Sequence, residues 1–170
     1  MSLDQPTRQI IGGLVSESPG LHLREIQRRT GIAIGSLMYH IEILRKSGAV
    51  VVENRRGKTR LFPTSIDAGE RDNLDLLRQA TVRSTVLYLI GSPGAMHKDL
   101  VDHLNLAPST VSWYLKRLER TGAIRVEIEG RKRRYSVIDP VEIVRTLKAY
   151  RASFKDRLLD NFISFWDNGR

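Results

Sequence analysis

The amino-acid sequence predicts a mainly α-helical protein with small β-hairpins, built from two copies of one unit and a further C-terminal helix. Three observations predict this fold class. The chain repeats itself, each copy reads as three helices and a hairpin, and an amphipathic stretch follows the second copy. A length of 170 residues suits two small domains, and 41% hydrophobic residues suffice for packed cores.

The internal repeat emerges when residues 34–50 are shifted onto residues 108–124, a step of 74 positions (for example from Leu44 to Leu118). Equivalent positions then hold similar residues: Ser36 and Thr110, Ile41 and Leu115, Gly48 and Gly122, Ala49 and Ala123, and Val50 and Ile124. Downstream, residues 55–62 match residues 129–136 with Gly57 on Gly130 after a one-residue gap. We interpret the chain as two copies of one unit.

The first copy has the spacing of three helices and two strands. We expect helices over residues 7–16, 22–30 and 35–47, with apolar stripes of Ile10, Ile11, Leu14 and Val15 in the first and Leu37, Ile41 and Leu44 in the third. Gly31 and Gly48 are expected to end the second and third helices. A β-branched run at residues 50–52, a turn at 54–58 and a return at 59–62 predict a hairpin.

The second copy repeats this layout. Its first helix is expected to end near Ile90, its second to cover residues 98–104, and its third to open at Pro108 with Ser109 or a neighbouring residue as the N-cap. The buried stripe of the third helix is expected to be Val111, Leu115 and Leu118, and a basic turn at residues 130–133 predicts the second hairpin.

Three helices followed by a β-hairpin wing are the pattern of the winged helix-turn-helix. The segments SLMYHIEILRKSGAV and TVSWYLKRLERTGAI resemble a motif of the MarR/ArsR-like winged-helix regulators, and the paired copies resemble archaeal regulators with two such domains. The second copy departs from the motif, since Tyr114 stands where the first has His40. The resemblance implies DNA binding and transcription regulation.

We expect three parts: a first winged-helix domain over residues 1–68, a second with its connecting helix over 69–139, and a C-terminal amphipathic helix over 140–170. One continuous helix over residues 73–90 is expected to join the copies, with Leu74, Leu77, Val86 and Leu89 buried. The C-terminal helix begins at Pro140 and carries apolar residues at Ile143, Leu147, Tyr150, Phe154, Leu158, Phe162, Phe165 and Trp166. Because it holds three of the four Phe, we expect it to form a homodimer interface; the alternative is that it packs on its own chain.

The charge balance and the third helices predict the DNA-binding residues. A net charge of +9 favours a polyanionic partner. The third helix of each copy would enter the major groove, and the wings would contact phosphate. The predicted DNA-binding residues are Ser36, Tyr39, Arg45, Ser109, Thr110, Ser112, Trp113, Lys116 and Arg117 on these helices, and Arg55, Arg56, Lys58, Arg60, Arg131, Lys132, Arg133 and Arg134 on the wings.

Alternatives to a duplex-binding regulator remain open. Tyr39 and Trp113 could stack on unpaired bases, as in single-strand or non-specific DNA-binding proteins of replication, repair or chromatin. A protein-interaction module of the transcription machinery is a further alternative, which the basic wings disfavour. Tyr39 and Trp113 could instead form contacts between the two units. We interpret His40 as a partly buried structural residue that supports the third helix.

Several classes of function are not expected. The chain has no cysteine, its four histidines are scattered, and it shows no nucleophile or phosphate-loop motif, so we expect neither enzyme activity nor a metal or cofactor. We expect no signal peptide and no membrane association, and the absence of cysteine suits a cytoplasmic protein.

Overall fold

A computed structural model of the chain describes residues 4–55, 57–154 and 157–169. Its contacts divide the chain into two compact units, which we describe separately. Residues up to Asp75, with residues 152–154, form the first unit, and residues 76–151 with 157–169 form the second.

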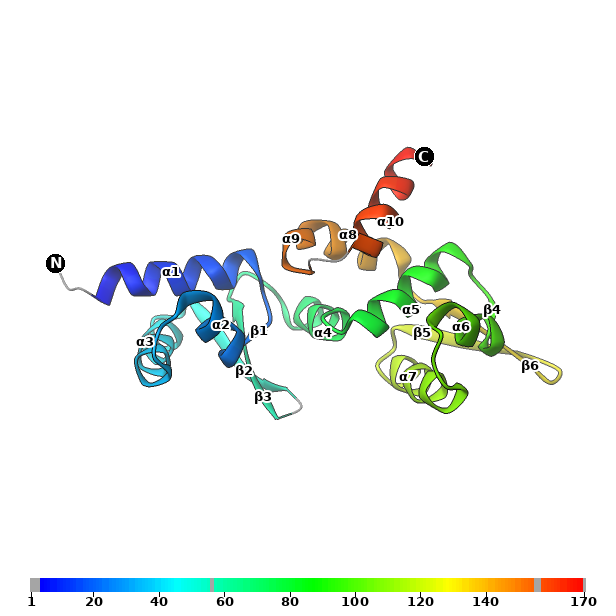
Figure 1. The fold of residues 1–170 in the computed structure, drawn as a ribbon, viewed down its shortest axis with the longest axis horizontal. Helices are drawn as coiled ribbons and strands as arrows, with labels where there is room; N and C mark the ends of the chain where they lie inside the picture. Colours follow the sequence, from blue (N-terminus) through cyan, green and yellow to red (C-terminus); the bar gives the residue numbers. More distant parts are fainter. Residues whose placement is uncertain (1–3, 56, 155–156, 170) are drawn as a thin grey trace. The chain divides into compact units, whose positions relative to one another are not determined.

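The first unit is a winged helix, in which three helices pack against a small sheet (Figure 1). Its elements are α1 (Asp4–Glu17), β1 (Leu21–His22), α2 (Leu23–Thr30), α3 (Ile34–Lys46), β2 (Val50–Arg55) and β3 (Lys58–Pro63). The sheet is antiparallel with the order β1-β3-β2, so the hairpin gains a short third strand. The core joins Ile11 and Val15 of α1 to the predicted stripe Leu37, Ile41 and Leu44 of α3.

The second unit repeats the first element by element. Its elements are α5 (Ala80–Gly91), β4 (Ala95–Met96), α6 (His97–Leu104), α7 (Pro108–Arg120), β5 (Ile124–Glu129) and β6 (Lys132–Val137), with the sheet order β4-β6-β5. The predicted stripe Val111, Leu115 and Leu118 is buried. Mainly helical units with small antiparallel hairpins confirm the predicted fold class.

The turn of each wing corrects the predicted alignment. The pairs Arg55↔Lys58 and Glu129↔Lys132 close two-residue turns, and both hairpins keep the same 74-residue step without a gap. Gly57 is therefore the second residue of its turn and Gly130 the first of the other. Each has a positive φ, +71° and +62°, which glycine adopts at no steric cost. The sequence comparison inserted a gap because it aligned the glycines rather than the strands.

Two further expectations about the helices are wrong. The expected continuous joining helix is two helices, α4 (Ala68–Leu77) and α5, because Gln79 has extended backbone with φ −84° and ψ 121°. Helix α7 begins at Pro108 as expected, and its N-cap is the neighbouring Ala107 rather than Ser109. Ile10, expected in the buried stripe of α1, is 56% exposed. The side of α1 that faces the core is the one that carries Ile11 and Val15.

The C-terminal region is also not one helix. It forms α8 (Pro140–Ala149), α9 (Arg151–Phe154) and α10 (Arg157–Asn168). Asp139 caps α8 by accepting a hydrogen bond from the Glu142 amide, with Pro140 in the first turn as expected. Helix α10 packs against α5 and α8 and buries Leu159 and Ile163. The ends of these helices were not predicted, because the apolar residues keep their helical spacing across the breaks between them.

Candidate nucleic-acid interface

Helices α3 and α7 are the third helices of the two units and present their polar sides to solvent. Burial of the apolar stripe fixes which side of each helix faces outward. The predicted contact residues with exposed side chains on these helices are Ser36, Tyr39, Arg45, Ser109, Thr110, Trp113 and Lys116. Each unit therefore has a helix whose exposed side could reach base edges in a major groove.

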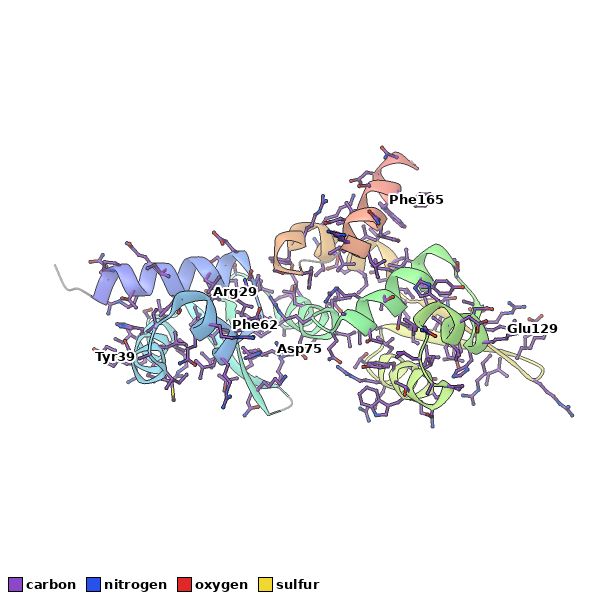
Figure 2. All side chains as sticks on the ribbon, viewed as in Figure 1. Arg29, Tyr39, Phe62, Asp75, Glu129 and Phe165 are labelled. Carbon is purple, nitrogen blue, oxygen red and sulfur yellow. The ribbon has the colours of Figure 1, made fainter. Side chains whose placement is uncertain are left out.

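Tyr39 and Trp113 occupy equivalent positions and are exposed to the same degree, 57% and 56%. Each ring meets the ring of the next residue edge to face: Tyr39 on His40 at 5.2 Å and Trp113 on Tyr114 at 4.9 Å between centroids. His40 is buried, as expected of a structural residue. More than half of each aromatic side chain is therefore exposed to solvent, and Figure 2 shows Tyr39 on α3.

The charge at the centre of the exposed side differs between the two helices. Glu42 of α3 accepts hydrogen bonds from Arg45 at 2.8 Å and 2.7 Å and lies 3.7 Å from Lys46. The hydrogen bond from Arg45 lowers the pKa of Glu42 below its usual value. In α7 the equivalent residue is Lys116, which has no ion pair with any described residue. Helix α3 thus carries a carboxylate at the centre of its exposed side, where α7 carries a cation.

Arg117 does not face outward as the sequence predicted. Its side chain is 9% exposed, and its guanidinium donates to the Gln79 side chain at 2.8 Å. The same guanidinium lies 5.5 Å from the centre of the Trp113 ring. The long side chain reaches from α7 to the residue that precedes α5, so Arg117 holds the helix and supports Trp113 rather than extending to solvent.

Ser112 is half-buried and connects α7 to α6. The Nε2 atom of His97 lies 2.9 Å from the Ser112 hydroxyl and 3.2 Å from the carbonyl oxygen of Pro108. Sequence reasoning did not select His97, although the repeat alignment places it at the start of the second helix, beside the wing. No group of three metal-binding side chains is present among the described residues.

The arginines of the first wing are bound within their own unit. Arg55 forms ion pairs with Glu53 and Asp72, and its guanidinium lies 5.7 Å from the centre of the Phe62 ring. Arg60 donates to the Gly20 carbonyl at 2.7 Å and forms an ion pair with Asp75. Lys58 is exposed, and Arg56 lies outside the described residues. Acidic residues of β2 and α4 therefore hold Arg55 and Arg60, whereas their role in DNA binding stays a prediction.

The second wing differs, since three of its four cations are exposed. Arg131, Lys132 and Arg133 form no ion pair within the part of the chain that the structure describes. Arg134 instead donates to Glu129 at 3.0 Å and to the Gly94 carbonyl at 3.3 Å. Arg134 and Gly94 are the equivalents of Arg60 and Gly20, so this arginine position supports the sheet in both units.

Two equivalent grooves lie between the start of the second helix and the wing. In the second unit the groove has a volume of about 460 Å³ and is lined by Met96, His97, Lys98, Ser112, Arg131, Lys132, Arg133 and Tyr135. In the first unit it has a volume of about 260 Å³ and is lined by His22, Leu23, Arg24, Gly57, Lys58 and Thr59. Lys98 and Arg24, which sequence reasoning missed, occupy equivalent positions in these linings.

The chain therefore contains two helix-turn-helix domains, each with its hairpin wing. Residues 5–74 match a family described as an N-terminal HTH domain, and residues 82–125 match a family described as winged helix-turn-helix DNA-binding. Each family covers one of the two repeats. Among the described residues, no helix has the length and apolar character needed to cross a membrane.

The chain is similar to an uncharacterized HTH-type transcriptional regulator of Methanocaldococcus jannaschii. The two are 29% identical over 135 residues, which cover 79% of this chain and 34% of the relative. The chain thus spans about one third of the length of that curated relative.

The chain is also similar, at low identity, to parts of solved structures. The DIP2311 protein of Corynebacterium diphtheriae is 14% identical, with a TM-score of 0.33, over 79% of this chain and 26% of its own. The mRNA-binding domain of elongation factor SelB from E. coli is 15% identical, with a TM-score of 0.31, over 81% of this chain and 98% of its own.

Proposed function

We propose that the protein is a DNA-binding transcription regulator. The observation that carries the proposal is the repeated winged helix, each copy of which presents an outward third helix beside a wing. The matched family described as winged helix-turn-helix DNA-binding and the printed name of the archaeal relative support it. The proposal includes a cytoplasmic location and no catalytic step. We also propose that the protein belongs to the MarR/ArsR-like superfamily, because its two segments that end SGAV and TGAI resemble the motif of that superfamily.

In the proposed complex, α3 and α7 lie in major grooves and the wings lie along the phosphate backbone. Hydroxyl groups of Ser36, Ser109 and Thr110 are suited to base edges or phosphates, and the apolar rings of Tyr39 and Trp113 to thymine methyl groups. The cations of the second wing supply phosphate contacts, which carry no sequence information but position the protein. We expect double-stranded DNA to be the partner.

Single-stranded DNA is the second candidate ligand, favoured by the exposed rings of Tyr39 and Trp113. Aromatic side chains with one open face stack on unpaired bases, and a protein with this preference would belong to replication, repair or chromatin. The two ligands make different demands on Trp113. A ring that stacks on a base contributes about 1–3 kcal/mol to binding, whereas a duplex presents no free base face to it.

Fluorescence anisotropy with random duplex and random single-stranded DNA, at two salt concentrations, tests this proposal. We expect tighter binding to the duplex and a steep loss of affinity with salt. Trp113→Ala should weaken duplex binding more than Tyr39→Ala, since Lys116 lies one turn from Trp113 and Glu42 from Tyr39. Single-strand preference with a large Trp113→Ala effect would support the second candidate. No binding to either ligand would remove both and favour the protein-interaction module.

We also propose that the protein forms a homodimer through α10. Leu158 and Phe165 are seven residues apart on this helix, so they share one side of it, and they are 56% and 75% exposed. Figure 2 shows Phe165 on α10. Large apolar side chains that remain exposed together on one element commonly mark an interface.

A further inference from the structure

The groove of the second unit carries an unusual concentration of positive charge. Four of its eight lining residues are cationic: Lys98 from α6 and Arg131, Lys132 and Arg133 from the wing. The lining contains no acidic side chain. His97 and Ser112, which hydrogen-bond to each other at 2.9 Å, add two polar groups to the same surface.

These four cations are not neutralised by neighbouring carboxylates. None of them forms an ion pair with a described residue. The nearest acidic residue on α6, Asp99, accepts a hydrogen bond from the Met96 amide at 2.8 Å, and Glu129 of the wing pairs with Arg134. The groove therefore presents uncompensated charge to solvent, which an anion would offset.

The equivalent groove of the first unit has a different balance. Only Arg24 and Lys58 of its lining are cationic, and glycine and threonine stand where the second unit has Arg131 and Arg133. Among the described arginines of the first wing, Arg55 and Arg60 are paired with Glu53, Asp72 and Asp75. These two arginines therefore bind carboxylates of their own unit.

The third helices differ in where their charges lie, since α7 has Lys116 where α3 has Glu42 and Glu119 where α3 has Arg45. At equivalent central positions α3 carries Glu42, with Arg45 and Lys46 both beside it, and α7 carries Lys116 without an ion-pair partner among the described residues. A phosphate that approached the middle of α3 would meet a carboxylate, and one that approached α7 would meet an ammonium group.

We propose that the two units divide DNA binding unequally, with the backbone phosphate site in the groove between α6 and the wing of the second unit. Lys98, Arg131, Lys132 and Arg133 contact phosphodiester oxygens there, and His97 and Ser112 lie within the same site. The first unit supplies few phosphate contacts. This inference rests on the proposed function, since it assigns where the DNA backbone is held.

The physical basis is counterion release. Each cation that neutralises a phosphate of duplex DNA contributes about 0.9 to the slope of log K against log salt concentration. A cation already paired with a carboxylate must break that pair before it contacts phosphate, so it adds less to affinity. The slope therefore reports which unit makes the contacts.

Matched double substitutions test the division, because the repeat offers equivalent pairs. One variant is Lys98→Ala with Lys132→Ala in the second unit, and its control is Arg24→Ala with Lys58→Ala in the first. All four side chains are exposed, and circular dichroism would verify that both variants fold. Binding of a random duplex is measured by anisotropy over a range of salt concentrations.

We expect the second-unit variant to lower the salt slope by nearly two and the first-unit variant to lower it by less than half of that. Equal losses, a larger loss from the first-unit variant, or no loss from either would overturn the division of DNA binding. Failure of the proposed function is distinguishable, because the unchanged protein would then show no salt-dependent duplex binding.

Discussion

Arg60 illustrates how a basic residue in a wing can serve the fold instead of a ligand. Its guanidinium joins β3 to the Gly20 carbonyl and to Asp75, and the side chains of the Arg60–Asp75 ion pair are 11% and 5% exposed. The equivalent Arg134 makes the same contact with Gly94 but keeps a 40% exposed side chain. The arginine at this position is thus more buried in the first unit than in the second.

The first prediction concerns stability. Arg60→Ala should lower the free energy of unfolding by about 3–5 kcal/mol, because it removes the ion pair between Arg60 and the buried Asp75 carboxylate. Lys58 lies two residues before Arg60 on β3, and its side chain is exposed. Lys58→Ala should therefore change the free energy of unfolding by less than about 0.5 kcal/mol. Urea unfolding followed by circular dichroism measures both. Similar effects from the two variants would show that the Arg60–Asp75 pair does not stabilise the fold.

A second prediction follows from His22 in the groove of the first unit. Burial lowers the pKa of His22, Glu25 raises it in part, and Lys58, Arg60 and Arg28 lower it further. The unfolded chain therefore binds a proton at higher pH than the folded chain. Stability contributed by neutral His22 is present above the unfolded pKa of about 6.5 and is lost as the pH falls towards the folded value.

Urea unfolding at several pH values below 6.5 tests this, with His22→Gln as the comparison. The unchanged protein should lose stability more steeply than the variant as the pH falls through this window. Parallel pH profiles would show that His22 does not contribute.

At the scale of elements, periodic burial could be predicted from the sequence and individual long polar side chains could not. Leu37, Ile41 and Leu44 were predictable because a helix repeats its buried side every three to four residues. Arg117 was not, because its direction depends on Gln79, which lies 38 residues earlier in the chain. The pairing of Arg55 and Arg60 was not predictable for the same reason, because Asp72 and Asp75 lie on α4, outside the wing. The basic turn of the second wing was predictable from adjacent residues, whereas the position of Lys98 beside it was not.

The caps of α2 and α6 give a third prediction. Gly31 ends α2 with a φ of +70°, and the equivalent Asn105 ends α6 with a φ of +50°. Gly31→Ala should lower the free energy of unfolding by about 1–2 kcal/mol, because the left-handed conformation brings Cβ too close to the backbone. Gly31→Asn should cost less, since asparagine tolerates this conformation.

Gly12 provides a matched control for that prediction. It lies in the interior of α1, and a Cβ added there would meet nothing within 4 Å. Gly12→Ala should therefore raise the free energy of unfolding by about 0.5–1 kcal/mol. Thermal and urea unfolding would measure both substitutions. A stabilising Gly31→Ala would contradict the left-handed cap.

For the whole molecule, the sequence repeat has produced two units with the same fold and different surfaces. The core positions hold apolar residues in both copies, whereas the exposed position of Lys116 has become Glu42 in the first. Packing constrains the interior, and the surface is free to change charge without loss of the fold. The two copies of a duplicated domain can in this way keep the same fold and differ in the ligand contacts that their surfaces make.

The last prediction concerns the homodimer. Deletion of residues 151–170 would remove Leu159 and Ile163 from the core of the second unit, so loss of dimers after deletion would not separate the interface from the fold. Leu158→Lys with Phe165→Lys changes only exposed side chains of α10. This variant should be monomeric by light scattering, because charged groups in an apolar interface lose their hydration without a partner.

Val141→Lys is the matched control, since Val141 is 61% exposed on α8 and also apolar. It should leave the homodimer intact. If the unchanged protein is monomeric, or if only Val141→Lys disrupts the dimer, α10 is not the interface. Dimers that persist in both variants would also exclude Leu158 and Phe165. A dimer lost only with those two residues would mean that one complex presents four winged helices, so its DNA affinity would depend on protein concentration as well as on salt.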